Sequence, residues 1–113
     1  MITPTQPLGE LEQLVLLVVW RLGNAAYGLS VRDEIHARAG RTISVSTAYL
    51  TMTRLEGKGL VRSRVVDPRP VRGGKGRRVF VITRSGTAAV KRARMTMDRM
   101  WDGLEGLTPG LDT

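Results

Sequence analysis

Apolar residues recur at helical spacing in four stretches of the chain, and the first of these is apolar on nearly all sides. It runs from Leu8 to Leu22, with acids in its first turn and Arg21 in its last, as the helix dipole favours. Its main stripe consists of Leu11, Leu14, Val15, Val18 and Leu22, and Leu16, Leu17, Val19 and Trp20 continue the stripe around the helix. A chain of 113 residues can cover only part of such a helix, so the pattern predicts either a second subunit against it or an unusually deep position.

The second helix is shorter and is followed by a β-branched segment. Val31 and Ile35 repeat at helical spacing and predict a helix from Ser30 to Ala39, with Ser30 three residues before Asp33 in a variant of the capping box. Residues 41–45 are then either a brief edge strand or an extended lead into the third helix.

The third helix, over residues 46–58, has two different faces. Ala48, Met52 and Leu55 fall on one face at the spacing of a buried stripe. Ser44 or Ser46 can cap the helix, and Gly57 with Gly59 ends it. The other face carries mainly short hydroxyl side chains and two cations: Ser46, Thr47, Leu50, Thr51, Arg54 and Lys58. Such a face is either ordinary solvated surface or a surface that can approach base edges and phosphates.

Two strand-like segments and a fourth helix complete the pattern. Residues 60–66 and 78–83 enclose a stretch rich in glycine, proline and arginine, which predicts a β-hairpin with an extended basic tip. Thr83 or Ser85 can cap the last helix, whose stripe consists of Ala89, Ala93, Met97, Met100 or Trp101, and Leu104. The predicted fold is mainly α with a small β-hairpin. Its parts are a flexible arm (1–7), a body (8–83), a C-terminal helix (84–104) and a flexible tail (105–113).

Charge and composition narrow the function. Lys and Arg number 18 against 10 Asp and Glu, a net charge of +8 that indicates a polyanionic partner such as DNA, RNA or an anionic membrane. The chain has no Cys and one His, and no nucleophile elbow, nucleotide-binding loop or metal-ligand spacing, so we expect no metal, no cofactor and no enzymatic activity. The longest apolar run, Leu14 to Trp20, falls far short of the roughly 20 residues that span a bilayer, and the N-terminus does not resemble a signal peptide. We therefore expect a soluble, cytoplasmic protein with no membrane partner.

The order of three helices, a two-stranded wing and a long last helix is that of winged helix-turn-helix DNA-binding domains. Within that class the chain resembles the PadR family of bacterial transcriptional regulators. The similarity covers about Leu8 to Trp101. It is carried by Leu8-Gly9-Glu10-Leu11-Glu12, the stretch Ala26 to Ile35, Val45-Ser46-Thr47-Ala48-Tyr49, the stretch Arg54 to Val61, and Gly73-Gly74-Lys75-Gly76-Arg77-Arg78.

The resemblance implies a homodimeric repressor that places the helix at 46–58 in the major groove and pairs its first and last helices with those of a second copy. By position, Tyr49 matches the tyrosine that the family places beside the DNA backbone, and Ser46, Thr47, Leu50 and Thr51 match groove-facing residues. Three features depart from the family pattern. Tyr27-Gly28-Leu29 replaces a His-Gly-Tyr turn, Val79-Phe80 replaces paired wing aromatics, and a single helix replaces a larger C-terminal region, as in the short-tailed subgroup.

These patterns define three sets of candidate residues. The DNA-binding set is Ser46, Thr47, Tyr49, Leu50, Thr51, Arg54, Lys58, Arg69, Arg72, Lys75, Arg77 and Arg78. The dimer-interface set is Leu11, Leu14, Val18, Ala93, Met97, Met100 and Trp101. The third set is Trp20 and Trp101, which either pack at the interface or enclose a flat effector molecule, as tryptophan pairs do in some members of the family. The alternatives to a DNA-binding repressor are a winged helix that binds RNA and one that acts as a protein-interaction module.

Overall fold

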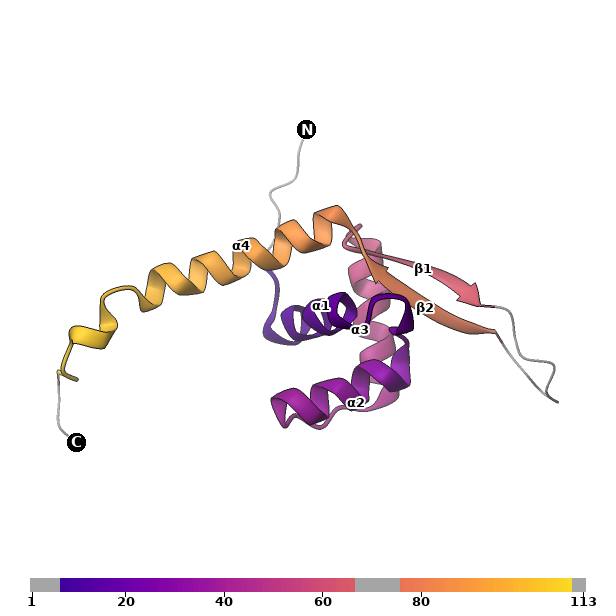
Figure 1. Cartoon of the computed structure of the whole chain (residues 1–113), viewed down its shortest axis with the longest axis horizontal. Helices are drawn as coiled ribbons and strands as arrows, with labels where there is room; N and C mark the ends of the chain where they lie inside the picture. The colour runs from indigo at the N-terminus through magenta and orange to yellow at the C-terminus, as the bar shows by residue number, and fades with distance from the viewer. Residues whose placement is uncertain (1–6, 67–75, 111–113) are drawn as a thin grey trace.

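The computed structural model describes residues 7–66 and 76–110 of the chain. Its elements in order are α1 (Glu10–Leu22), the 3-10 turn η1 (Gly23–Ala25), α2 (Gly28–Ala39), α3 (Val45–Gly57), β1 (Val61–Val66), β2 (Arg77–Ile82), α4 (Arg84–Trp101) and η2 (Leu104–Gly106). The first three helices form the body, the hairpin projects from one side of it, and α4 extends away on the other side (Figure 1). The described part is thus mainly helical with one two-stranded sheet, as the sequence pattern predicts.

The core of the body lies where the apolar stripes of the three helices meet. α1 contributes Val15, Leu16 and Val19, α2 contributes Val31 and Ile35, and α3 contributes Ala48, Met52 and Leu55, all of them buried. Val18, which we predicted for the subunit interface, is only 5% exposed and belongs to this same core, so that prediction is wrong. Its side of α1 is covered by the chain itself.

The hairpin joins this core through the side chain of Phe80. β1 and β2 are antiparallel, with Val61 opposite Ile82 at one end and Val66 opposite Arg77 at the other. Phe80 is completely buried, and its amide donates to the carbonyl oxygen of Ala26 at 2.8 Å. β2 is therefore held on one edge by β1 and on the other by the turn that precedes α2.

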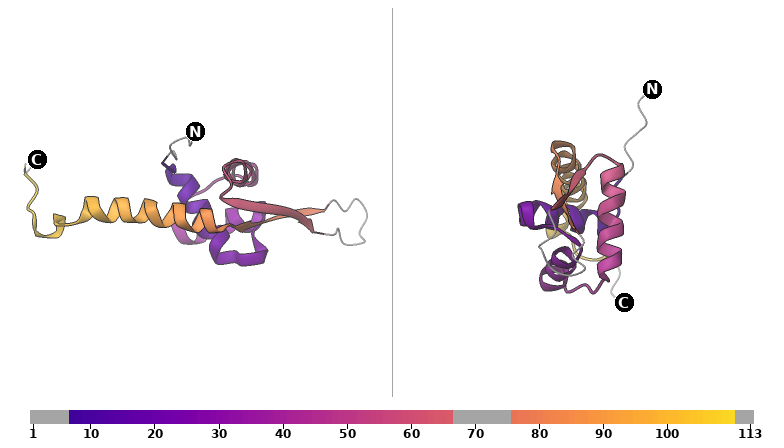
Figure 2. Two further views of the ribbon diagram at one scale, coloured as in Figure 1. Left: turned by 90° about the horizontal axis from the view of Figure 1, so that it is seen from above. Right: turned by 90° about the vertical axis from the view of Figure 1, so that its right-hand side faces the viewer.

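α4 is buried over its first half only. The hydroxyl of Thr83 caps the helix by accepting from the amide of Gly86 at 3.0 Å, and Ala89 and Val90 pack into the core. All residues from Arg94 to Trp101 are exposed. The second half of the helix leaves the body, as the view from above shows (Figure 2). The helix ends at Trp101 rather than at Leu104 as predicted, because Gly103 takes a left-handed conformation with φ of 84°.

Two predictions about the start of α2 and α3 are refined by the structure. α2 begins at Gly28, so Ser30 is not the N-cap residue but lies in the first turn, where its hydroxyl accepts from the amide of the N-cap Tyr27. Residues 41–44 form an extended lead rather than a strand, and Ser44 caps α3 by accepting from the amide of Thr47 at 2.9 Å. None of the helices in the described ranges is long and apolar enough to cross a membrane.

Candidate nucleic-acid interface

Between the first and last residues of α3, its exposed surface is a single ridge along the helix. It consists of Ser46, Tyr49, Leu50, Thr53 and Arg54, which repeat at three- and four-residue spacing opposite the buried stripe. Leu50 is the most prominent apolar member, with 60% of its surface exposed. We call these five residues the α3 ridge. It carries two hydroxyls, a phenol, one apolar side chain and one guanidinium, and no carboxylate.

Thr51 does not belong to the α3 ridge, and the prediction that it lies on the free face is wrong. Only 2% of its surface is exposed, and its hydroxyl donates to the carbonyl oxygen of Thr47 at 2.7 Å. Thr53 takes the exposed position instead, and its hydroxyl donates to the carbonyl oxygen of Tyr49 at 3.0 Å. The four-residue spacing from Tyr49 to Thr53 could have identified Thr53 from the sequence.

Thr47 and Lys58, at the two ends of α3, have structural partners. The Thr47 hydroxyl accepts from the hydroxyl of Ser44 at 2.9 Å, within the cap of the helix. The ammonium group of Lys58 donates to the carboxylate of Glu12 on α1 at 2.7 Å.

Glu12 receives a second hydrogen bond, from the amide of Gly9 at 2.9 Å. Burial alone would raise the pKa of Glu12, but the hydrogen bonds from Lys58 and Gly9 and the charges of Lys58 and Arg54 together lower it below its ordinary value. The buried carboxylate is thus kept ionised and anchors the end of α3 to α1.

Tyr49 and the base of the hairpin form the junction between α3 and β2. The Tyr49 ring lies edge-on to the ring of Phe80, with 5.9 Å between centroids and an interplanar angle of 75°. Beside it is a surface depression of about 600 Å³ between the starts of α2 and α3 and the start of β2. We call it the wing-base depression. It is lined by Tyr27, Gly28, Leu29, Val45, Ser46, Tyr49, Leu50, Arg77 and Arg78.

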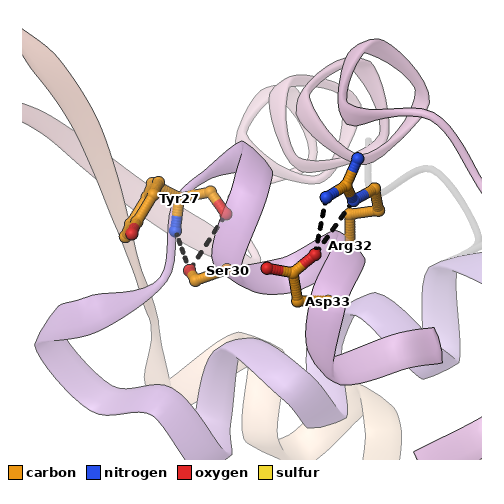
Figure 3. A network of polar contacts seen from close by, with 4 residues as sticks. All are labelled: Tyr27, Ser30, Arg32 and Asp33. Carbon is orange, nitrogen blue, oxygen red and sulfur yellow. Dashed lines mark hydrogen bonds and ion pairs between the residues drawn. The ribbon is translucent and has the colours of Figure 1, made fainter. Parts of the chain in front are cut away.

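Arg77 is held at this depression by an aromatic ring. Its guanidinium carbon lies 3.8 Å from the centroid of the Tyr27 ring, within the range of a cation–π contact. Tyr27 is positioned in turn by Ser30, whose hydroxyl accepts from the Tyr27 amide at 3.0 Å and donates to the carbonyl oxygen of Ala25 at 2.7 Å (Figure 3 shows the Tyr27–Ser30 contacts). In the next turn Arg32 pairs with Asp33, so Asp33 takes no part in capping α2 (Figure 3).

Arg78, the neighbour of Arg77 in β2, is positioned by side chains of β1 and α3. Its guanidinium donates to the hydroxyl of Ser63 at 2.8 Å, and Ser63 donates in turn to the carboxylate of Glu56. The exposed side chains of Arg62 and Arg64 alternate with Ser63 along β1 and therefore lie on the other face of the hairpin. The remaining predicted wing cations, Arg69, Arg72 and Lys75, lie outside the described residues.

The predicted interface residues other than Val18 lie at or near the surface. Leu11 and Leu14 are partly buried against the core, and Ala93 is half-buried. Met97, Met100 and Trp101 are exposed on the half of α4 that leaves the body. These positions leave an apolar surface on α4 that the single chain does not cover.

Trp20 and Trp101 are not brought together within one chain. Trp20 is 43% exposed, and the ammonium group of Lys91 on α4 lies 5.7 Å from its ring centroid. Trp101 is 59% exposed and follows Lys91 by almost three helical turns, roughly 15 Å along the axis. A ligand site built from both rings would need a second chain.

Comparison with known proteins places the chain in a family. The model of the transcriptional regulator PadR-like family matches residues 15–92. The chain is 35% identical over 79 residues to the transcriptional regulator Rv3488 of Mycobacterium tuberculosis, covering 68% of this chain and 67% of that protein. It is also similar to the crystal structure of a PadR family transcriptional regulator from Eggerthella lenta, with 29% identity and a TM-score of 0.68 over 90% of this chain and 88% of the other.

A second solved structure shows how far the fold extends. The PadR-like transcription factor structure from Bacteroides fragilis has a TM-score of 0.71 over 87% of this chain and 89% of that chain, at 17% identity. At that identity the similarity is evidence for the fold alone. The winged-helix architecture and the family match agree, and the chain belongs to the PadR-like family of transcriptional regulators.

Proposed function

We propose that this protein is a homodimeric repressor that places the α3 ridge in the major groove of an inverted-repeat operator. The observation that carries the proposal is the position of the α3 ridge beside Arg77 and Arg78 at the wing-base depression. A helix that presents small and cationic groups fits the major groove, while arginines at the groove edge fit the phosphates. This arrangement would read bases with α3 and bind the backbone with the wing.

Within the α3 ridge, Arg54 and Leu50 are proposed to contribute selectivity in different ways. The Arg54 guanidinium is long enough for paired hydrogen bonds to O6 and N7 of guanine. Leu50 offers apolar surface to the methyl group of thymine. Tyr49, next to Phe80 and the depression, is proposed to lie against the DNA backbone. Because the ridge has no Asn or Gln, part of the selectivity is expected to come from DNA shape.

The role of Leu50 can be tested by replacing thymine with uracil in a bound duplex, which removes only the 5-methyl group. We expect the affinity of the parent protein for the duplex to fall roughly threefold to tenfold for each contacted thymine that is replaced by uracil. We expect the Leu50→Ala variant to bind the thymine and uracil duplexes equally well. Equal sensitivity to uracil in the parent and in Leu50→Ala would reject a thymine-reading role for Leu50.

We propose a homodimer because the apolar stripe of α4 extends beyond the segment that the body of the same chain covers. Ala89 and Val90 on this stripe are buried, whereas Met97, Met100 and Trp101 on the same side are exposed. A second copy of the chain would cover this segment and Leu17 and Trp20 of α1. Two-fold symmetry then predicts half-sites about one DNA turn apart, roughly 34 Å.

The two tryptophans are proposed first as packing residues of this interface. If one ring from each protomer instead enclosed a flat effector, adding that molecule would quench tryptophan fluorescence and change DNA affinity together. A cytoplasmic location fits a regulator that must reach DNA and belongs to the same proposal.

Selection of bound fragments from genomic DNA is the most direct test of the proposal. We expect an inverted repeat, and an affinity that falls about 10³ to 10⁵-fold between 50 and 200 mM salt if six to ten phosphates are neutralised. A matched hairpin RNA in the same assay provides the control. Stronger binding to RNA, or binding to neither nucleic acid, would replace the proposal with the RNA-binding or protein-interaction alternative.

A further inference from the structure

We infer that Glu56 is a positioning residue for DNA binding, which orients Arg78 of the wing through the hydroxyl of Ser63. The inference rests on the proposed role of Arg78 at the DNA backbone and adds a residue outside the α3 ridge, whose carboxylate pairs with the hairpin. Glu56 lies in the last turn of α3, Ser63 in β1 and Arg78 in β2, so the three residues join the recognition helix to both strands of the hairpin.

The hydrogen bonds run in one direction, from the cation to the anion. Arg78 Nη1 donates to Ser63 Oγ at 2.8 Å. Ser63 Oγ donates to the Glu56 carboxylate, whose Oε2 lies 2.7 Å away, and the Ser63 amide donates to the same oxygen at 2.9 Å. Because a hydroxyl has only one hydrogen, the carboxylate directs that hydrogen toward itself and leaves the lone pairs of Ser63 Oγ for Arg78. Both contacts of the hydroxyl involve a charged group and are therefore stronger than neutral hydrogen bonds.

The position of the three residues gives this chain of hydrogen bonds a function. Arg78 lines the wing-base depression together with Tyr49 and Ser46 of α3, whereas Glu56 and Ser63 are only partly exposed. Strand register places Ser63, Val65 and Arg78 on the same face of the hairpin, the face that also carries the buried Phe80. An arginine on this face would otherwise have many rotamers, and holding it in one conformation before DNA arrives reduces the entropy lost on binding.

The expected effect of removing the Glu56 carboxylate on DNA affinity is opposite to the effect that net charge alone predicts. Removing an acid raises the net charge by one unit, and this alone would tighten binding to a polyanion. If Glu56 positions Arg78, Glu56→Ala instead weakens binding. The matched control is Glu34→Ala, which makes the same charge change on α2, where the carboxylate pairs with Arg38 of the same helix.

The test measures affinity for a duplex recovered by genomic selection, by fluorescence anisotropy at fixed salt, for four proteins in addition to the parent. These are Glu56→Ala, Arg78→Ala, the double variant, and Glu34→Ala. We expect Glu56→Ala to weaken binding roughly fivefold to tenfold, Glu34→Ala to leave it unchanged or tighter, and the double variant to bind like Arg78→Ala alone, since a residue acting through Arg78 has no effect without it. Tighter binding by Glu56→Ala, or additive effects of Glu56→Ala and Arg78→Ala, would overturn the inference.

A second pair of variants keeps the test decisive if Glu56→Ala does not fold. Ser63→Thr and Ser63→Val have the same shape and differ only in the hydroxyl group, and both suit a β-strand. We expect Ser63→Thr to bind within about twofold of the parent and Ser63→Val to bind as Glu56→Ala is expected to. Equal affinity of the two Ser63 variants would reject the hydroxyl as the link. If instead Arg78→Ala itself bound like the parent, the proposed wing contact of Arg78 would fail while the hydrogen bonds remained structural.

Discussion

Replacing Gly86 with alanine tests how α4 is docked on the rest of the domain. A Cβ atom at Gly86 would lie 2.1 Å from the carbonyl oxygen of Leu60 and 2.7 Å from Cγ1 of Ile82. The first distance is more than 1 Å shorter than a normal carbon–oxygen contact of roughly 3.3 Å, and the obstructing atom is backbone that cannot rotate away. The start of α4 and the lead into β1 must therefore separate, at a cost of about 3 kcal/mol or more in the free energy of unfolding.

The measurement is urea or thermal unfolding at a fixed protein concentration, since the stability of a dimer depends on concentration. A loss of that size corresponds to a fall in Tm on the order of 15 °C for a domain of this length. Gly57→Ala is the matched control, because a Cβ at Gly57 would meet no atom within 4 Å, so the substitution should stabilise α3 by about 0.5 kcal/mol. A Gly86→Ala protein as stable as the parent would refute the close packing of α4 against Leu60.

Three further sets of substitutions test the salt bridge, the dimer and the α3 ridge. Because the pKa of Glu12 is lowered in the folded protein, its contribution is present at neutral pH and is lost as the pH falls below about 4.5, the ordinary pKa of glutamate. Glu12→Gln should therefore cost about 1 to 3 kcal/mol at pH 7 and flatten the acid limb of the stability curve in urea titrations. An unchanged acid limb in the Glu12→Gln variant would argue against this role. For the proposed dimer, Met97→Asp should raise the dimer dissociation constant at least about tenfold in sedimentation equilibrium, because a carboxylate would have to lose its water in the proposed interface. Met95→Asp, on the opposite side of the exposed half of α4, should leave the constant unchanged. For the α3 ridge, Thr51→Val should keep the parent's sequence preference and Thr53→Ala should alter it. The reverse result in a binding selection would place the groove face on the other side of α3.

Hydrophobic periodicity was sufficient to predict the elements and the buried faces of α2 and α3. The stripes of α1, α2 and α3, the two strands and the amphipathic α4 all lie within a few residues of their predicted bounds, because each depends on spacing along one element. The net charge and the basic hairpin likewise indicated a polyanionic partner without reference to any contact. The family match is consistent with that reading.

The burial of residues at the margins of each stripe depends on the tertiary structure. Thr51 flanks the buried face of α3, and only the position of the packed body decides that its side chain is covered. Val18 was assigned to a partner for the same reason, since nothing in α1 alone tells which of its apolar sides the chain itself covers.

The polar contacts that position the candidate interface could not be predicted from the sequence, for a different physical reason. Lys58 and Glu12 are 46 residues apart, and Arg78 and Ser63 are 15 apart. Whether such groups pair depends on the docking of whole elements to within a hydrogen-bond length, which periodicity does not specify. Local spacing therefore determined which helix could face DNA, and three-dimensional packing determined which of its side chains are free to do so and which hold the wing beside it.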